Sequence, residues 1–436
     1  MKKLTIYTIL ILSILSLHAQ DSVMVRKWIE ALSSSGMYGR SFAYQGDSIA
    51  AAYLKQQLIT NSIAPLQGDY YQSYTLPNFA MEGNVKIEFN GKTLDPYNEY
   101  RIWASSKSIQ KDNIPVITVE PEIILSTKNL TKFKDKHYEK ISQSIIYVDI
   151  LNPKFQKKDK DGEKRKAILQ TLHSANPFQS LGYIIPVNKL PAWSVSNHEK
   201  ERDYALLYIC ETVFPKKWKN INIHFNNRHD IHQTQNVCAK VEGTQYPDSM
   251  ILFVAHYDHV GVMGEVLFPG AHDNASGTAT VMALAHYFKK NPLPYTTVFC
   301  FFSGEEIGLK GSTYFVEHPV IDLKKVKMVL NIDMACGGNA GLMMVNSQAD
   351  DTRHLYDRFV NVNKEKGYFP EIKSRPNAAN SDHYPFTKNG VPAVFIYVLG
   401  GKSGGYHQPT DTSANCSLEK WEELFHLIVD VINFYK

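Results

Sequence analysis

Apolar residues near the start of the chain recur every three or four positions, from Val25 through Trp28 to Leu32. A second series with the same spacing begins at Ala50. This period places the apolar side chains on one face of a helix. The pattern over residues 24–60 therefore predicts two helices.

A different pattern begins near residue 84. Short apolar runs alternate with turn residues, and the clearest example is VKIEFNGKTL, in which Asn90 and Gly91 form a hairpin signal between two strand-like runs. The pattern continues to about residue 235 and predicts a separate β-rich unit. Within it, the charged stretch 157–166, KKDKDGEKRK, predicts a solvated loop rather than a binding patch.

Beyond residue 236, apolar strand-like runs alternate with amphipathic helical segments. The predicted strands are 250–256, 296–304, 325–334 and 391–399, and the predicted helices are 276–288, 355–367 and 418–435. Apolar strands separated by helices indicate a mostly parallel sheet covered on both faces. We therefore predict an α/β fold, with a three-layer α/β/α domain built on a mostly parallel mixed sheet. In such sheets, ligands bind beyond the carboxyl ends of the strands.

The chain opens with Lys2 and Lys3, an apolar run from Leu4 to Leu17, and the small residue Ala19. This is the layout of a secretory signal peptide, so we expect residues 1–19 to be cleaved and the mature protein to be secreted or periplasmic. An uncleaved membrane anchor is the alternative, but about 14 apolar residues fall short of the ~20 that span a bilayer. We therefore expect no stable membrane insertion after cleavage.

Composition and charge narrow the function classes. With 44% hydrophobic and 21% charged residues, the chain is typical of folded globular proteins, which excludes disorder, collagen-like repeats and coiled coils. The net charge of the 436 residues is only +4, so no strong basic field indicates nucleic acid as a partner. Five scattered cysteines without a C-x-x-C pair indicate neither a disulfide scaffold nor a thiolate zinc site.

Imidazole and carboxylate side chains gather at the predicted carboxyl ends of the strands. They are His256 and Asp258 after the first strand, Asp273 at the start of the first helix, Glu305 and Glu306 after the second strand, Asp333 at the end of the third, and His407 after the fourth. A single acid at a strand end is more often a helix cap. Acids packed together repel unless cations neutralise them, so the whole set predicts a metal site. Imidazole and carboxylate ligands without thiolate suit zinc, with manganese or cobalt as alternatives.

Six motifs in this region resemble, in order, those of the co-catalytic di-zinc aminopeptidases, a family that includes secreted bacterial aminopeptidases and plasma glutamate carboxypeptidase. The motifs are VAHYDHVG, GAHDNASG, FSGEEIGLKGS, NIDM, SDHYPF and YHQPTDT. The resemblance identifies residues 236–436 as the zinc peptidase catalytic domain and 20–83 as its amino-terminal helical part. Less closely, residues 84–235 resemble the protease-associated domain that some members insert there.

The resemblance also implies how the metal ligands are shared. Asp273 would bridge two zinc ions. His256 and Asp333 would complete one site, and Glu306 and His407 would complete the other.

Three further residues receive roles from the resemblance. Glu305 would be the general base that takes a proton from the attacking water and passes it to the leaving amine. Asp258 would accept a hydrogen bond from the far nitrogen of His256 and so fix its tautomer. Tyr406 would stabilise the developing oxyanion, and simple packing beside the site is the alternative.

Two features fall outside this assignment. His272 stands where many relatives have an acid, although the neighbouring Asp273 is preserved. Ser381, Asp382 and His383 match a motif that we place at the pocket wall without a chemical role.

The implied function is a secreted zinc exopeptidase, first of all an aminopeptidase acting on peptides. The alternatives within the family are a carboxypeptidase or dipeptidase, a glutaminyl cyclase that uses one zinc ion, and a catalytically dead binding protein such as the transferrin receptor. Retention of both His256 and Asp333 favours two metals and hydrolysis. Side-chain preference, the choice between amino- and carboxy-terminal trimming, and the oligomeric state stay open.

Other hydrolase classes fit the sequence less well. The segment 401–405, GKSGG, matches the G-x-S-x-G pattern of serine hydrolases, but the residues that follow it have no helical pattern. No H-E-x-x-H motif occurs, which excludes the single-zinc helix proteases.

Overall fold

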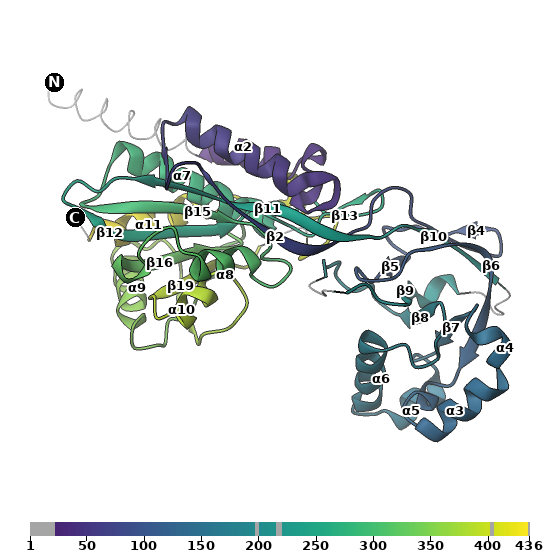
Figure 1. Ribbon diagram of the computed structural model, residues 1–436. Helices are drawn as coiled ribbons and strands as arrows, with labels where there is room; N and C mark the ends of the chain where they lie inside the picture. Colours follow the sequence, from purple (N-terminus) through teal and green to yellow (C-terminus); the bar gives the residue numbers. More distant parts are fainter. Residues whose placement is uncertain (1–21, 197–199, 215–219, 402–404, 435–436) are drawn as a thin grey trace, which may run out of the picture. The chain divides into compact units, whose positions relative to one another are not determined.

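The computed structural model describes residues 22–196, 200–214, 220–401 and 405–434. The chain divides into two compact units (Figure 1). Unit 1 comprises the chain up to Leu76, His232–Gly261 and the chain from Phe268 onwards, and unit 2 comprises Pro77–Ile231 and Val262–Leu267. The predicted signal peptide and the centre of the GKSGG segment lie outside the described residues.

The core of unit 1 is a nine-stranded mixed sheet. Its strands are β1 (Ala64–Pro65), β2 (Tyr71–Ala80), β11 (Arg228–Val241), β12 (Tyr246–His256), β15 (Tyr295–Phe302), β16 (Val326–Ile332), β17 (Gly341–Val345), β18 (Ile372–Arg375) and β19 (Ala393–Leu399). The part of β2 after Leu76 and the part of β11 before His232 belong to unit 2. They follow the order β1-β11-β15-β12-β16-β19-β17-β18, and β2 pairs with β11. The central strands β15, β12, β16 and β19 are parallel, whereas β11 and β17 run antiparallel to β15 and β19. This confirms the predicted mixed, mostly parallel sheet.

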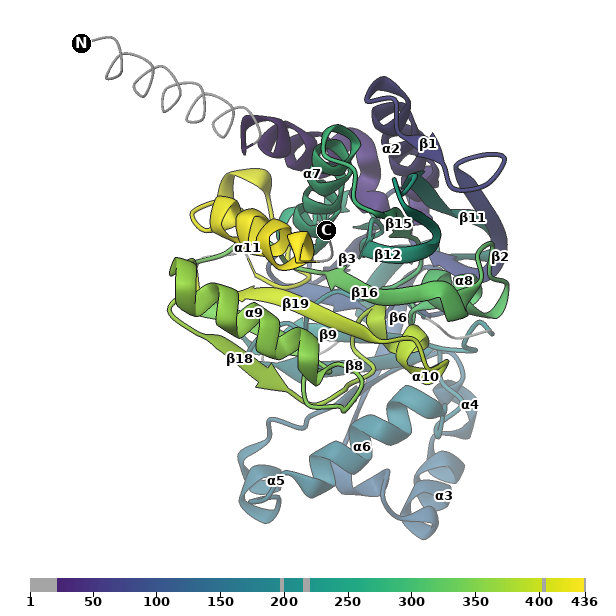
Figure 2. The same cartoon turned by 90° about the vertical axis from the view of Figure 1, so that its left-hand side faces the viewer.

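Helices cover both faces of this sheet. One face packs against a helix over residues 22–32 and against α2 (Gly46–Thr60), α7 (Ser276–Lys290), α9 (Arg353–Lys366) and α11 (Trp421–Asn433). The other face packs against α8 (Lys310–Glu317) and α10 (His383–Lys388), and Figure 2 shows α7 and α11 on the opposite side of the sheet from α10. In β12, Phe253 faces the first layer and Leu252 the second, so both faces need apolar side chains. The predicted three-layer α/β/α architecture is thereby confirmed.

Unit 2 is built on an eight-stranded sheet with the order β4-β3-β10-β6-β7-β8-β9-β5. The strands are β3 (Lys86–Phe89), β4 (Lys92–Thr93), β5 (Tyr100–Ile102), β6 (Ile109–Val119), β7 (Ile145–Val148), β8 (Gly182–Val187), β9 (Ala205–Cys210) and β10 (Asn220–Phe225). Strands β3 and β4 pair antiparallel around Asn90 and Gly91, as the hairpin signal predicts. The small hairpin of β13 (Val262–Met263) and β14 (Val266–Leu267) belongs to this unit.

Four helices in unit 2 were missed by the sequence pattern. They are α3 (Thr127–Lys136), α4 (Tyr138–Ile141), α5 (Pro153–Lys158) and α6 (Glu163–Ser174). The prediction of a loop over 157–166 is correct only for 159–162, because residues 157–158 end α5 and residues 163–166 begin α6. The charges obscured the helical period, since α6 buries only Ile168 and Leu172.

Within the part of the chain that the structure describes, no helix has both the length and the apolar composition of a membrane span.

Candidate functional site

The predicted strand-end residues come together at one edge of the sheet in unit 1. His256 ends β12, Glu305 and Glu306 follow β15, Asp333 follows β16, and His407 lies in the loop after β19. Asp273 lies in η5 (Ala271–Ala275), a short distorted segment that directly precedes α7. Because β12, β15, β16 and β19 are parallel, their carboxyl ends point to the same edge. Topology alone therefore gathers residues that are far apart in sequence.

A first group of metal-ligand atoms forms around His256. Its Nε2 lies 3.2 Å from Oδ1 of Asp333 and 3.4 Å from Oδ1 of Asp273. Ligand atoms of His256, Glu305 and Asp333 all lie within 4.8 Å of one another. The imidazole is only 1% exposed, so these charges are shielded from water.

A second group forms around His407. Its Nε2 lies 3.1 Å from Oδ2 of Asp273 and 3.0 Å from Oε2 of Glu306. Asp273 thus presents one carboxylate oxygen to each imidazole. The group also contains His259, whose Nδ1 lies 2.8 Å from Oε1 of Glu306. His259 is not among the ligands predicted from the sequence, although it stands inside the motif VAHYDHVG.

The separations between these donors fit a zinc ion in each group. Two ligands at zinc-bonding distance from one tetrahedral ion lie about 3.3 Å apart. The four imidazole-to-carboxylate separations are 3.0, 3.1, 3.2 and 3.4 Å. Imidazole nitrogen and carboxylate oxygen are also the donor types that zinc accepts, so the residues present fit the metal that the sequence predicts.

The adjacent residues Glu305 and Glu306 differ in their acidity. Desolvation raises the pKa of Glu305 well above its ordinary value, and the nearby Glu306 carboxylate adds to this rise, although His256 opposes it. Desolvation alone would also raise the pKa of Glu306, but His407 and His259 lower it to about 2. A permanently ionised carboxylate suits a metal ligand, and a carboxylate that holds protons more readily suits proton transfer.

Asp258 contacts both His256 and the turn that carries Glu305 and Glu306. Its carboxylate accepts hydrogen bonds from the backbone N–H groups of Glu305 and Glu306, at 3.2 and 3.4 Å. For Nδ1 of His256 it offers its backbone carbonyl oxygen at 3.2 Å and a carboxylate oxygen at 3.6 Å. Asp258 therefore lies where it orients both the imidazole and the Glu305–Glu306 turn.

Two buried residues outside the predicted set hold the Asp273 segment. Asp411 accepts hydrogen bonds from the backbone N–H groups of His272 and Asp273, at 2.8 and 3.1 Å. Arg40, at the end of η1 (Ser35–Arg40), is 0% exposed and donates to backbone carbonyl oxygens. Its acceptors are the carbonyl groups of Leu32, Tyr257, Pro269, Gly270 and Asp273. Asp411 falls within the motif YHQPTDT, whereas nothing in the sequence around Arg40 marks it.

Tyr406 and Ser381 both contact predicted ligands. The ring of Tyr406 stacks on His407 with centroids 3.7 Å apart, and the residue is 58% exposed. Ser381 donates a hydrogen bond of 2.7 Å to Oδ2 of Asp333, and Asn331 donates to the Ser381 hydroxyl at 2.6 Å. Ser381 therefore holds the Asp333 oxygen that does not face His256.

The next two residues of the same motif lie outside both donor groups. Asp382 and His383 are fully buried. Ser312 donates a hydrogen bond to Asp382, and burial raises the pKa of this carboxyl to about 7. Burial lowers the pKa of His383 to about 4. Among the described residues neither belongs to a group of potential metal ligands, and their place at the pocket wall stays a prediction.

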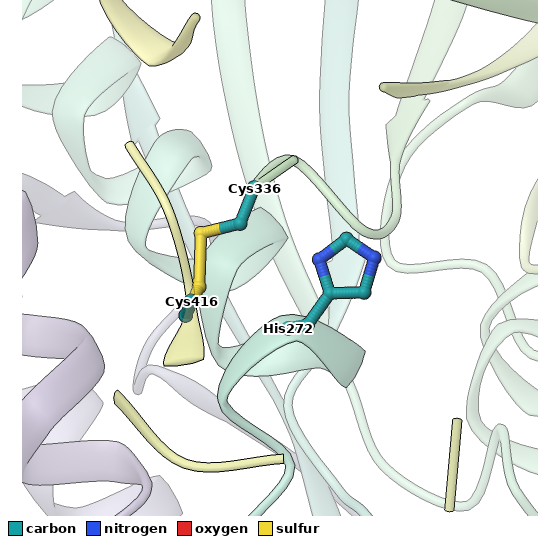
Figure 3. A group of neighbouring side chains, drawn as sticks. All are labelled: His272, Cys336 and Cys416. Atoms are coloured by element: carbon teal, nitrogen blue, oxygen red, sulfur yellow. A yellow bond between two sulfur atoms is a disulfide. The ribbon is translucent and has the colours of Figure 1, made fainter. Parts of the chain in front are cut away.

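A third cluster of potential metal ligands lies next to η5. Figure 3 shows the His272 ring beside Cys336 and Cys416, whose sulfur atoms are joined in a disulfide. Because both sulfur atoms are bonded to each other, they are not thiolate ligands. The disulfide instead connects the loop after Asp333 to the loop after His407. The two cysteines stand 80 positions apart, and their spacing alone did not indicate the pairing.

The part of the chain that carries the site matches a known protein family. Residues 236–432 match peptidase family M28. This chain carries an M28-family domain. The resemblance drawn from the six motifs is thereby confirmed, and the M28 domain contains both donor groups.

The chain has curated relatives among aminopeptidases. It is 26% identical over 209 residues to the aminopeptidase YwaD of Bacillus subtilis strain 168, a match that covers 46% of this chain and 44% of that protein. It is 28% identical over 228 residues to leucine aminopeptidase 2 of Trichophyton rubrum, covering 45% and 43%. The chain thus spans less than half of the length of these relatives.

Solved structures share the fold over most of the chain. A zinc aminopeptidase of Bacillus subtilis, BSAP, superposes with a TM-score of 0.66 at 16% identity, covering 94% of both chains. The aminopeptidase of Aneurinibacillus sp. strain AM-1 gives a TM-score of 0.61 at 18% identity, covering 94% of this chain and 92% of that one. The similarity of residues 84–235 to a protease-associated domain stays a prediction.

Proposed function

We propose that this protein is a secreted zinc-dependent exopeptidase that removes amino-terminal residues from peptides. One observation carries the proposal: two groups of largely buried imidazole and carboxylate donors meet at Asp273, and Glu305 belongs to the first of them. The M28 match and the aminopeptidases among the relatives support the same reaction class.

In the proposed centre, Asp273 would serve as a ligand in both zinc sites. His256 and Asp333 would complete one site, and Glu306 and His407 would complete the other. Zinc bound there would supply a Lewis acid that polarises the scissile carbonyl and lowers the pKa of water to near neutrality. Proton transfer and stabilisation of the oxyanion are assigned to side chains of the protein.

Glu305 is the proposed general base. It accepts a proton from the attacking water and donates that proton to the leaving amine. Its environment supports this role, because desolvation and the Glu306 charge raise the pKa of Glu305 and so favour a carboxyl that alternates between its two states. Glu306 is held ionised by His407 and does not compete for the proton.

Tyr406 is proposed to stabilise the oxyanion that develops on the substrate carbonyl. Its ring is stacked on the proposed ligand His407, which supports a position at the edge of the metal centre. Its 58% exposure leaves the residue accessible to a bound peptide. A hydroxyl donor aimed at developing negative charge contributes most when it is held in place before reaction.

Secretion rests on the signal-peptide layout of residues 1–19. We expect the protein recovered from the periplasm or the medium to begin at Gln20. Amino-terminal sequencing of that protein tests the cleavage, and a protein that retains Met1 would contradict it.

The reaction is tested by mass spectrometry of defined peptides incubated with the zinc-loaded protein, beside a Glu305→Gln variant. Shortening from the amino end, lost in the variant, is the expected result. Shortening only from the carboxyl end would retain the metal chemistry but overturn the aminopeptidase assignment. Loss of ammonia from an amino-terminal glutamine would indicate a glutaminyl cyclase, and no change in any peptide would favour a binding protein.

A further inference from the structure

The two terminal carboxylates of the proposed centre are held in the same way. Asp333 directs Oδ1 towards His256, while its Oδ2 accepts a hydrogen bond from Ser381 at 2.7 Å. Glu306 directs Oε2 towards His407, while its Oε1 lies 2.8 Å from Nδ1 of His259. In each case one oxygen faces the metal group, and the other meets a side chain that can donate a hydrogen bond.

We propose that His259 is a positioning residue, which donates a hydrogen bond from Nδ1 to Oε1 of Glu306 and thereby holds Glu306 as a one-oxygen ligand. This inference rests on the proposed zinc function. His259 would do for Glu306 what Ser381 does for Asp333, so that each zinc ion has one carboxylate ligand locked by a hydrogen bond.

The alternative is that His259 itself binds the metal, and the distances argue against it. Nδ1 of His259 lies 2.8 Å from the Glu306 carboxylate, a hydrogen-bond length that is shorter than each of the four separations between the proposed ligands. The contact is also made to Oε1, whereas His407 meets Oε2. His259 therefore approaches the oxygen that points away from the His407 imidazole.

The ring of His259 is fixed by its surroundings. Its side chain is 0% exposed, and the ring meets His407 edge to face with centroids 5.3 Å apart. Gly270 packs directly against it: a Cβ at position 270 would lie 2.4 Å from Cδ2 of His259 and 2.5 Å from its Cγ. Gly270 also has a φ of +62°, so both its conformation and the adjacent ring favour glycine.

The tautomer follows from the partners of the two ring nitrogens. Nδ1 faces a carboxylate oxygen, which only accepts hydrogen bonds. Among the described residues, none forms a hydrogen bond with the buried Nε2. The proton of the neutral ring therefore belongs on Nδ1, where it meets an acceptor.

Substitutions at position 259 separate the two roles. The amide nitrogen of asparagine lies close to the place of a histidine Nδ1 and donates a hydrogen bond, but asparagine is a poor zinc ligand. Phenylalanine keeps the ring volume and removes the donor. We therefore expect His259→Asn to preserve the function and His259→Phe to lose it. Ser381→Ala is the matched control, because it removes the equivalent donor from Asp333.

The experiment measures zinc stoichiometry and affinity of the full-length protein by competition with a chromophoric chelator. In His259→Phe, we expect one of two zinc equivalents to weaken by about 10–100-fold, the usual effect of losing such a partner. His259→Asn should stay within about threefold of the wild type. Ser381→Ala should weaken the other equivalent, so that the Ser381→Ala, His259→Phe double variant weakens both.

Two results would overturn the inference while leaving the proposed function intact. Wild-type affinity for both equivalents in His259→Phe would show that the contact is unimportant. Equal losses in the asparagine and phenylalanine variants would make His259 a metal ligand. If the phenylalanine variant does not fold, as judged by circular dichroism of the metal-free protein, His259→Leu provides the same comparison. A wild-type protein that binds fewer than two zinc ions would refute the proposed centre itself.

Discussion

Replacing Arg40 with methionine would remove a buried guanidinium that joins three parts of unit 1. Its donors reach the carbonyl oxygens of Leu32, Tyr257, Pro269 and Gly270 at 2.7 Å each, and that of Asp273 at 3.3 Å. These acceptors belong to the first helix, the loop that follows His256 and the segment that carries Asp273. The side chain therefore ties the start of the chain to both sides of the proposed metal centre.

The expected loss of stability is large, because methionine fills the space but donates no hydrogen bond to any of these carbonyl groups. A hydrogen bond to a charged group contributes about 1.5–3 kcal/mol. Taking only the four contacts at 2.7 Å, at the lower end of that range, gives about 6 kcal/mol. Stability of natural domains is of the same order, about 5–15 kcal/mol. We therefore expect Arg40→Met to lower the melting temperature by more than about 10 °C.

Thermal unfolding of the metal-free protein, followed by circular dichroism, measures this effect without any contribution from zinc. Arg26→Met is the matched control, because Arg26 is partly exposed and donates one hydrogen bond to the carbonyl of Ser413. We expect the control to change stability by about 1 kcal/mol. Arg40→Lys keeps the charge with fewer donors and should fall between the two. A melting temperature of Arg40→Met within about 2 °C of the wild type would refute the reasoning.

Three further predictions concern the site itself. Glu305→Gln should fold and bind zinc but lower turnover by about 10³-fold or more, and a variant with near-normal kcat would exclude Glu305 as the base. Tyr406→Phe should lower kcat by about 10²-fold, and unchanged kcat in steady-state assays would leave Tyr406 a packing role only. Burial raises the pKa of Asp382 from 3.8 to about 7, so the folded, metal-free protein keeps a proton that the unfolded chain loses between about pH 4 and 7. Stability due to this group is then lost as pH rises through that window, and Asp382→Asn should remove roughly 3 kcal/mol of the decline between pH 4.5 and 8. Urea unfolding at pH 4.5 and 8 measures this difference, and parallel profiles of variant and wild type would contradict it.

The fold of unit 1 was predictable where elements are long and regularly patterned. The central strands are buried on both faces, and α7 and α11 are long enough for the helical period to appear. Shorter elements could not be predicted, because too few of their residues are buried to form a hydrophobic pattern. Helix α8 contributes only Phe315 and Val316 to its apolar cluster, and the edge strand β18 has four residues.

The site likewise contains residues that the sequence predicts and residues that it does not. The strand-end acids and histidines follow strands whose direction the pattern determines, so their meeting was predictable from topology. His259 and Asp411 stood inside quoted motifs, but their contacts depend on side-chain directions that the sequence does not reveal. Arg40 could not be found, because its partners are backbone carbonyl groups, and any residue type supplies those.

The most direct test of the proposed function is a titration of peptidase activity with zinc. Metal-free protein is given increasing equivalents of zinc, and amino-terminal shortening of a defined peptide is followed at each step. We predict no activity without metal and a rate that rises until two zinc ions are bound for each chain. Full activity in the metal-free protein, or no shortening of any peptide at two bound ions, would contradict it.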